Sequence, residues 1–90
     1  MTQSPIYEVR VLHEVRAILK NLDDDTFDHL ARNIDSLAFA PRREDAEELG
    51  EGFWLLRSGR SCILYSVDDG RLVVVLVKVI RPGEVFDSFN

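Results

Sequence analysis

The chain has 90 residues, of which 46% are hydrophobic and 30% charged, and its formal net charge is −5. This length suffices for one modest core, so residues 1–90 are expected to form a single domain. The only cysteine, Cys62, excludes an intramolecular disulfide and a metal cluster built on cysteines.

The N-terminal residues lack the basic and apolar segments of a signal peptide, and the longest apolar run stops at Lys78, short of a membrane span. We therefore expect a cytoplasmic protein without a membrane partner.

Charge is distributed unevenly along the sequence. Residues 13–51 contain eleven acidic and five basic residues, whereas residues 52–81 contain five basic and two acidic ones. Residues 52–81 are thus the positive half of an acidic protein.

Residues 6–12 alternate between apolar and charged side chains, which predicts a half-buried strand. Residues 13–22 then place apolar side chains at helical spacing and predict a short amphipathic helix. A second apolar stripe predicts a helix over residues 27–38 that ends near Phe39 or Ala40, before Pro41. The acidic run before it, residues 23–26, is interpreted as a helix cap and not as a cation site.

Residues 42–52 are polar and acidic, which predicts a loop or a single helical turn. Residues 53–80 contain three apolar runs separated by turns at residues 58–60 and 68–70, the pattern of consecutive antiparallel strands. The last run is apolar at successive positions, so we expect a strand buried on both faces in the centre of the sheet. Val85 and Phe86 are candidates for a short final strand. The predicted fold is α+β, with element order β-α-α-β-β-β(-β) and an antiparallel sheet packed against an N-terminal helical hairpin.

Strand alternation divides the second of these three strands into two faces. Ile63, Tyr65 and Val67 are the more apolar set and should face the helices. Cys62 and Ser66 would lie on the opposite, more open face. Arg57 from the preceding strand shares that face, and the same face could include Lys78 or Arg81 from the last strand and Arg60 from the turn. Such a basic groove can hold a phosphodiester backbone, and solvated surface cations are the alternative interpretation.

The sequence lacks a phosphate-binding loop, a dinucleotide fingerprint and zinc-binding motifs, so no cofactor and no metal are expected. The two histidines, His13 and His29, are expected on the helices and away from the sheet. A catalytic pair of Cys62 with either histidine is therefore disfavoured.

Two segments stand out beside the element order. They are Leu-Ala-Phe-Ala-Pro-Arg at residues 37–42 and Trp-Leu-Leu-Arg-Ser-Gly-Arg-Ser-Cys-Ile-Leu-Tyr at residues 54–65. Together with the element order, they resemble the RelE/ParE superfamily of bacterial type II toxins. The matching positions of the family pattern are Trp54, Arg57, Gly59, Ile63, Leu64 and Tyr65. The resemblance implies one toxin domain with a cognate antitoxin as its partner. RelE-type members cut mRNA on the ribosome, and ParE-type members poison DNA gyrase.

Several positions depart from the family pattern. Leu55 stands where the family often has a basic residue, and Cys62 stands where nucleases have an arginine that stabilises phosphate charge. Phe86 replaces a C-terminal tyrosine and has no hydroxyl. Arg57 and, approximately, Arg81 remain as the candidate catalytic residues that the resemblance implies. The candidate residues for binding RNA or another target are Arg60, Cys62, Ser66, Lys78 and Phe86.

Three hypotheses follow from this resemblance. The first is a RelE-like toxin that inhibits translation by ribosome-dependent mRNA cleavage, with partly degenerate catalytic positions. The second is a ParE-like toxin that cleaves no RNA and binds a protein target such as DNA gyrase. The third is an inactive member that retains only antitoxin binding.

Overall fold

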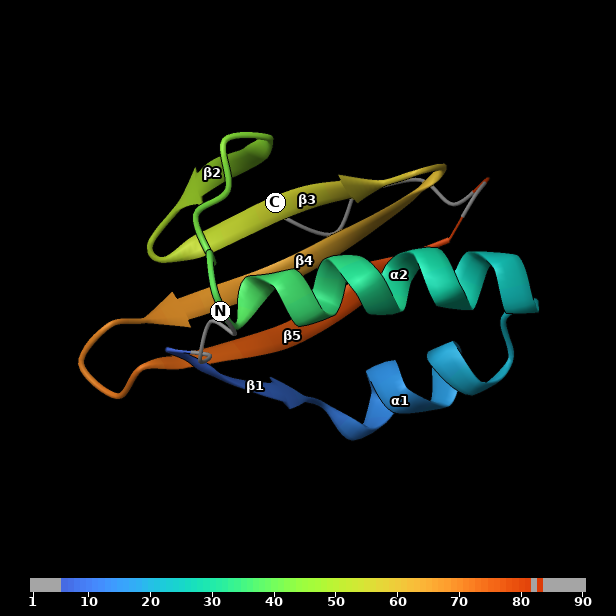
Figure 1. Cartoon of the computed structure of the whole chain (residues 1–90), viewed down its shortest axis with the longest axis horizontal. Helices are drawn as coiled ribbons and strands as arrows, with labels where there is room; N and C mark the ends of the chain where they lie inside the picture. Colours follow the sequence, from blue (N-terminus) through green and yellow to red (C-terminus); the bar gives the residue numbers. More distant parts are fainter. Residues whose placement is uncertain (1–5, 82, 84–90) are drawn as a thin grey trace, which may run out of the picture.

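The computed structural model describes residues 6–81 and 83. Its elements are β1 (Glu8–Val11), α1 (His13–Lys20), α2 (Asp24–Leu37), β2 (Ala46–Gly50), β3 (Phe53–Ser58), β4 (Ser61–Asp68) and β5 (Val73–Ile80). The strands form one sheet in the order β1-β5-β4-β3-β2, and the helices lie together on one side of it (Figure 1). The predicted α+β fold, with a helical hairpin against a sheet, is confirmed. The proposed strand at Val85 and Phe86 lies outside the described residues.

The last strand, β5, lies between β1 and β4, so its predicted central position is confirmed. Val74 and Leu76 are buried against the helices, whereas Val73 and Ile80 are buried on the opposite side of the sheet. A strand with both faces removed from water requires apolar side chains at successive positions, and the sequence of β5 supplies them.

The sheet is mixed and not purely antiparallel. β2, β3, β4 and β5 pair antiparallel in succession, as predicted, but β1 pairs parallel with β5. The register of this parallel pair runs from Glu8 opposite Val73 to Val11 opposite Leu76. Five elements separate β1 from β5 in the chain, so their relative direction is set by the long crossover and not by a tight turn.

The expected loop over residues 42–52 is wrong in part, because residues 46–50 form the edge strand β2. Glu47, Glu48 and Leu49 are exposed, so this strand lacks the apolar alternation that would predict it. It is held by backbone pairing with β3, where Ala46 lies opposite Leu56. A bulge between Glu48 and Gly50 interrupts the pairing.

The second helix, α2, begins where its acidic cap predicts. Asp23 is the N-cap residue, and its carboxylate accepts hydrogen bonds from the Thr26 backbone N–H at 3.1 Å and from the Thr26 hydroxyl at 2.7 Å. These bonds lower the pKa of Asp23 and satisfy a helix N–H that would otherwise lack a partner. The helix ends at Leu37, slightly earlier than the apolar pattern indicated.

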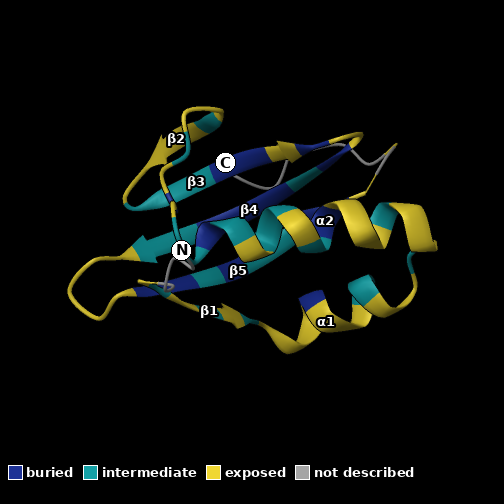
Figure 2. Cartoon of the chain, in the orientation of Figure 1, coloured by how far each residue is buried: buried dark blue, intermediate teal, exposed yellow. Residues whose placement is uncertain are grey.

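One hydrophobic core fills the space between the helices and the sheet. Ile63 and Tyr65 are fully buried there and Val67 packs at its margin, which confirms the predicted inner face of this strand. Val15, Leu30 and Leu37 are the buried residues that the helices contribute. Figure 2 shows buried residues concentrated on β3, β4 and β5, with exposed ones along the outside of α2 and on β2. Among the described residues, no helix combines the length and the apolar composition that crossing a membrane requires.

Tyr65 anchors the connection between α2 and β2. Its ring is fully buried, and its hydroxyl donates a 2.6 Å hydrogen bond to the Pro41 carbonyl oxygen. Burial raises the pKa of Tyr65 to about 12. The bond fixes the start of the segment that leads from the helical layer to the edge strand.

We predict that Tyr65→Phe lowers the free energy of unfolding by about 1–2 kcal/mol, because the buried Pro41 carbonyl loses its donor. Urea unfolding measures the loss. Tyr7→Phe is the matched control, because the Tyr7 hydroxyl donates to the exposed Asp69 and its loss should cost less. An equal loss of unfolding free energy in both variants would show that the buried Tyr65 bond stabilises the fold no more than the exposed Tyr7 bond does.

The raised pKa of Tyr65 also predicts a pH dependence. An unfolded tyrosine ionises near pH 10 and the folded one near pH 12, so the folded state holds the proton longer. The stabilisation is fully present below pH 10 and is lost as the pH rises toward 12. Unfolding curves between pH 10 and 12 should therefore show a steeper loss of stability in the wild-type chain than in Tyr65→Phe.

Candidate functional site

Four of the predicted site residues lie at one end of the sheet, on or next to the face opposite the helices. Arg57 on β3 is directly opposite Cys62 on β4, and Cys62 is directly opposite Ile80 on β5. Arg81 follows Ile80 in the chain, and Lys78 lies opposite Leu64, one row along the sheet and roughly 7 Å away. The register of three antiparallel strands therefore brings together cationic residues that are up to 24 positions apart in the sequence.

Arg57 and Arg81 are the exposed cations of this group, and Lys78 is half-buried. Arg57 lies within the row itself. Its side chain extends from β3 to solvent and forms no hydrogen bond or ion pair with any described residue. Cys62 beside it is half-buried, and its thiol is not in a disulfide. In this row the Arg57 guanidinium is therefore the cationic donor, and Cys62 beside it supplies no second cation. An arginine at the Cys62 position would have placed two guanidinium groups on directly opposed residues.

Ser66 does not join this group. It lies opposite Phe53 and Val75, four residues from Cys62 along β4 and so roughly 13 Å away. Phe86 lies outside the described residues.

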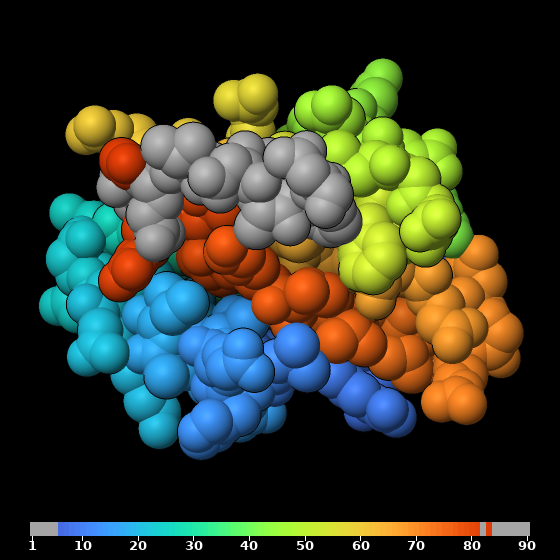
Figure 3. Space-filling model, turned by 180° about the vertical axis from the view of Figure 1, so that it is seen from behind, coloured from blue at the N-terminus to red at the C-terminus, as the bar shows by residue number. Residues whose placement is uncertain are grey.

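The face that carries these residues is less open than predicted. Leu55, Leu64 and Ile80 are only 9%, 3% and 5% exposed and form a second hydrophobic cluster with Cys62 and Val77. In Figure 3, which views the molecule from behind, the atoms of β5 occupy the middle, with α1 and β1 along one side. Among the described residues, the cationic side chains of this face therefore gather near Arg57, and an apolar cluster follows along the sheet.

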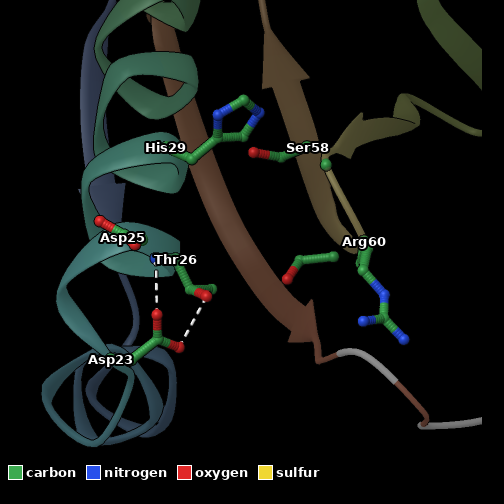
Figure 4. A pocket seen from close by; sticks show the side chains of 8 residues that line it. Asp23, Asp25, Thr26, His29, Ser58 and Arg60 are labelled. Carbon is green, nitrogen blue, oxygen red and sulfur yellow. Dashed lines mark hydrogen bonds between the residues drawn. The ribbon is translucent and has the colours of Figure 1, made fainter.

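Arg60 lies in the β3–β4 turn, just beyond the Ser58–Ser61 pair that follows the Arg57 row. It lines an open pocket of about 390 Å³ between the start of α2 and this turn, on the helical side of the sheet (Figure 4). The lining residues are Asp23, Asp25, Thr26, His29, Ser58, Gly59, Arg60 and Ser61. Sequence reasoning missed this pocket, because its two halves lie about thirty positions apart.

His29 reaches the sheet, contrary to the expectation that both histidines lie away from it. A methyl group placed on Gly59 would lie 3.5 Å from Cδ2 and 3.6 Å from Nε2 of His29, so the imidazole stands over the turn. Gly59 itself has φ of 62°, the left-handed conformation that a tight hairpin turn favours in glycine. The imidazole is on the helical side, whereas Cys62 points to the opposite face, so the structure does not pair them.

A polar network holds α2 against the end of β3. The Asn33 amide donates to the buried Ser58 hydroxyl oxygen at 2.7 Å, and its carbonyl oxygen accepts from the Arg43 guanidinium at 2.7 Å. Arg43 also donates to Ser36 and makes a two-bond ion pair with Asp45, which lowers the pKa of that carboxyl. One arginine thus connects the helix to the segment that enters β2.

A second polar cluster lies at the other end of the sheet. Arg42 donates to both carboxylate oxygens of Asp69, at 3.0 and 2.6 Å, and the Tyr7 hydroxyl donates to the same carboxylate. The hydrogen bonds from Arg42 are the main cause that lowers the pKa of Asp69, and the bond from Tyr7 lowers it further. The Arg42 guanidinium also lies 5.9 Å from the ring centre of Trp54. The cluster joins β1, the segment before β2 and the β4–β5 turn, and all its charged groups have partners.

In the described part of the chain, no three His, Cys, Asp or Glu side chains gather closely enough to hold a metal ion. The chemistry that the described residues offer is therefore that of cations, hydroxyls, one imidazole and carboxylates.

No protein-family model and no curated protein sequence matches the chain. Solved structures do. A chain of the archaeal RelE–RelB complex from Pyrococcus horikoshii OT3 matches with a TM-score of 0.75 and 22% identity, over 89% of this chain and 99% of that one. The toxin–antitoxin complex RelBE2 from Mycobacterium tuberculosis matches with a TM-score of 0.75 and 26% identity, over 87% and 99%. The isolated RelE toxin of E. coli matches with a TM-score of 0.74 and 20% identity, over 88% and 87%.

We predict that Asn33→Ala lowers the free energy of unfolding by about 1–2 kcal/mol, because the buried Ser58 hydroxyl and the Arg43 guanidinium lose a partner together. Arg32→Ala, at the exposed neighbouring position of α2, is the control and should change stability by less than about 0.5 kcal/mol. Chemical denaturation measures both variants. Equal losses would show that the Asn33 network does not hold α2 to the sheet.

Proposed function

From the premise that this chain has the fold of the RelE toxins, we propose that it is the toxin of a type II toxin–antitoxin module. The proposal treats residues 1–90 as one toxin domain that acts in the cytoplasm and is neutralised by a cognate antitoxin. The observation that carries it is the fold match, which covers nearly the whole length of proteins solved as RelE toxins and as complexes with their antitoxins.

Within this role we propose that the chain inhibits translation by cleaving mRNA on the ribosome, with partly degenerate catalytic positions. The supporting feature is the cationic end of the sheet, where Arg57 is exposed and Lys78 and Arg81 lie close by. Cleavage of RNA through its 2′-hydroxyl builds negative charge on the phosphate, and an unpaired guanidinium can stabilise that charge. Arg57 is assigned this role, with Arg81 beside it.

A second candidate function is a toxin that binds a protein target such as DNA gyrase and cleaves no RNA. Two features favour it. Cys62 puts a neutral side chain beside Arg57, in a row where a nuclease would profit from a second cation. The net charge of −5 also opposes binding to ribosomal RNA, where contacts with phosphate dominate affinity. An inactive member that only binds antitoxin is the remaining alternative.

The test is induced expression of the chain in a bacterial host, followed by mapping of mRNA ends in a translating extract. We expect growth arrest and new mRNA ends that require ribosomes. Arg57→Ala should reduce cleavage about a hundredfold or more, as the removal of one charge-stabilising group does in other active sites. Arg32→Ala, an exposed arginine on the far side of α2, should cleave as the wild type does.

Other outcomes separate the alternatives. Growth arrest with intact mRNA, together with lost DNA supercoiling by gyrase, would replace the nuclease assignment with the protein-target one. Absence of any growth defect would overturn the toxin proposal and leave only antitoxin binding. Cys62→Arg sharpens the distinction, because a gain of RNA cleavage in this variant would identify the site as a weakened nuclease.

A further inference from the structure

The pocket between α2 and the β3–β4 turn contains an unused hydroxyl group. Ser61 is only 2% exposed, and no described residue makes a hydrogen bond with its side chain. Among the described residues, every fully buried side-chain oxygen or nitrogen has a partner, so the unpartnered Ser61 hydroxyl is not completely closed off. Because Ser61 lines the pocket, its hydroxyl is available there to a ligand.

The opposite wall of the pocket is rich in acceptors. The Asp23 carboxylate accepts two bonds from Thr26, which fix its orientation, and each of its oxygens can accept another bond. Figure 4 shows the carboxylate of Asp23 beside the Thr26 hydroxyl, with His29 and Ser58 farther along the pocket. The helix cap thus holds a negative charge in place before any ligand arrives.

The charge of the pocket favours a cation. Two acidic residues, Asp23 and Asp25, line it, and in Figure 4 the Asp23 carboxylate faces the pocket while that of Asp25 points to the other side of the helix. The single arginine of the lining is Arg60, whose side chain points away from Asp23 and His29 in Figure 4. A helix N-terminus attracts anions, but here the Thr26 N–H is already bonded to the cap and two carboxylates occupy the same region. A guanidinium has five donors and no acceptor, and so complements a carboxylate set among hydroxyl oxygens.

We propose that this pocket binds the guanidinium group of an arginine side chain presented by a protein partner. The inference rests on the proposed function in taking the antitoxin as that partner. The guanidinium would donate to the exposed Asp23 carboxylate at the rim of the pocket and to the Ser61 hydroxyl oxygen deeper in it. Residues 13–51, which include α2 and carry eleven acidic against five basic residues, then attract a basic partner segment to the pocket.

The first experiment is an NMR titration of the isotopically labelled chain with Nα-acetyl-arginine methylamide. We expect saturable shifts at the backbone amides of Thr26, His29 and Ser61. The uncharged isostere, Nα-acetyl-citrulline methylamide, should leave these amides unchanged. Equal shifts with both compounds, or shifts produced by inorganic phosphate and not by the arginine derivative, would overturn the proposal.

Matched variants localise the binding. Asp23→Asn keeps a good helix cap but removes the charge, and should weaken binding roughly threefold to tenfold. Asp24→Asn makes the same charge change on the next residue, which does not line the pocket, and should leave binding unchanged. Ser61→Ala removes a hydroxyl that bonds no described residue, so it should weaken binding without lowering the melting temperature. Equal affinity in all three variants would place the arginine elsewhere.

A second arm identifies the source of the guanidinium. The affinity of the purified chain for the antitoxin encoded beside it is compared among the same variants, and Asp23→Asn should weaken the complex while Asp24→Asn should not. Unchanged affinity in Asp23→Asn would overturn the assignment to the antitoxin. This failure is distinct from that of the proposed function, which is decided by whether the wild-type chain arrests growth.

Discussion

The fold depends on the need to remove both faces of β5 from water. Full burial of a Val, Leu or Ile side chain contributes about 1.5–3 kcal/mol. An exposed ion pair such as Arg42–Asp69 contributes much less, because solvent screens it. The helices cover one face of β5, where Val74 and Leu76 are inaccessible, and Ile80 lies in the second cluster on the other. The polar clusters therefore position segments that the core has already brought together.

Local patterns were sufficient to predict the elements that this core uses. The apolar runs of residues 53–80 and the two helical stripes each show in their own spacing which side chains are buried. The acidic run predicts the start of α2 because the capping hydrogen bond joins residues only three positions apart. β2 could not be predicted in this way, because an edge strand is stabilised by backbone pairing and leaves Glu47 and Glu48 in water. The parallel direction of β1 depends on how the whole chain returns to β5, which no local window contains.

The same distinction explains which candidate residues strand alternation brings side by side. Arg57 and Cys62 were placed on one face by strand alternation, and the tight β3–β4 turn fixes them as direct partners. Ser66 shares that face but lies at the far end of β4, since alternation identifies a face and not a position along it. The pocket was invisible to such reasoning, because His29 approaches Gly59 only after the helical layer has packed on the sheet.

The β3–β4 hairpin carries both candidate sites. Arg57 and Ser58 are adjacent in β3, so their side chains point to opposite faces of the sheet. Arg57 extends to the face away from the helices, whereas Ser58 is buried against α2 by Asn33 and lines the pocket with Ser61, its partner across the turn. A partner held in the pocket would therefore not cover Arg57 directly. It would restrain Arg57 either by extending around the end of the hairpin or by shifting the hairpin itself. The Asn33–Ser58 bond opposes the second route, because such a shift would strain this part-buried hydrogen bond. The geometry therefore favours a partner that wraps around the hairpin.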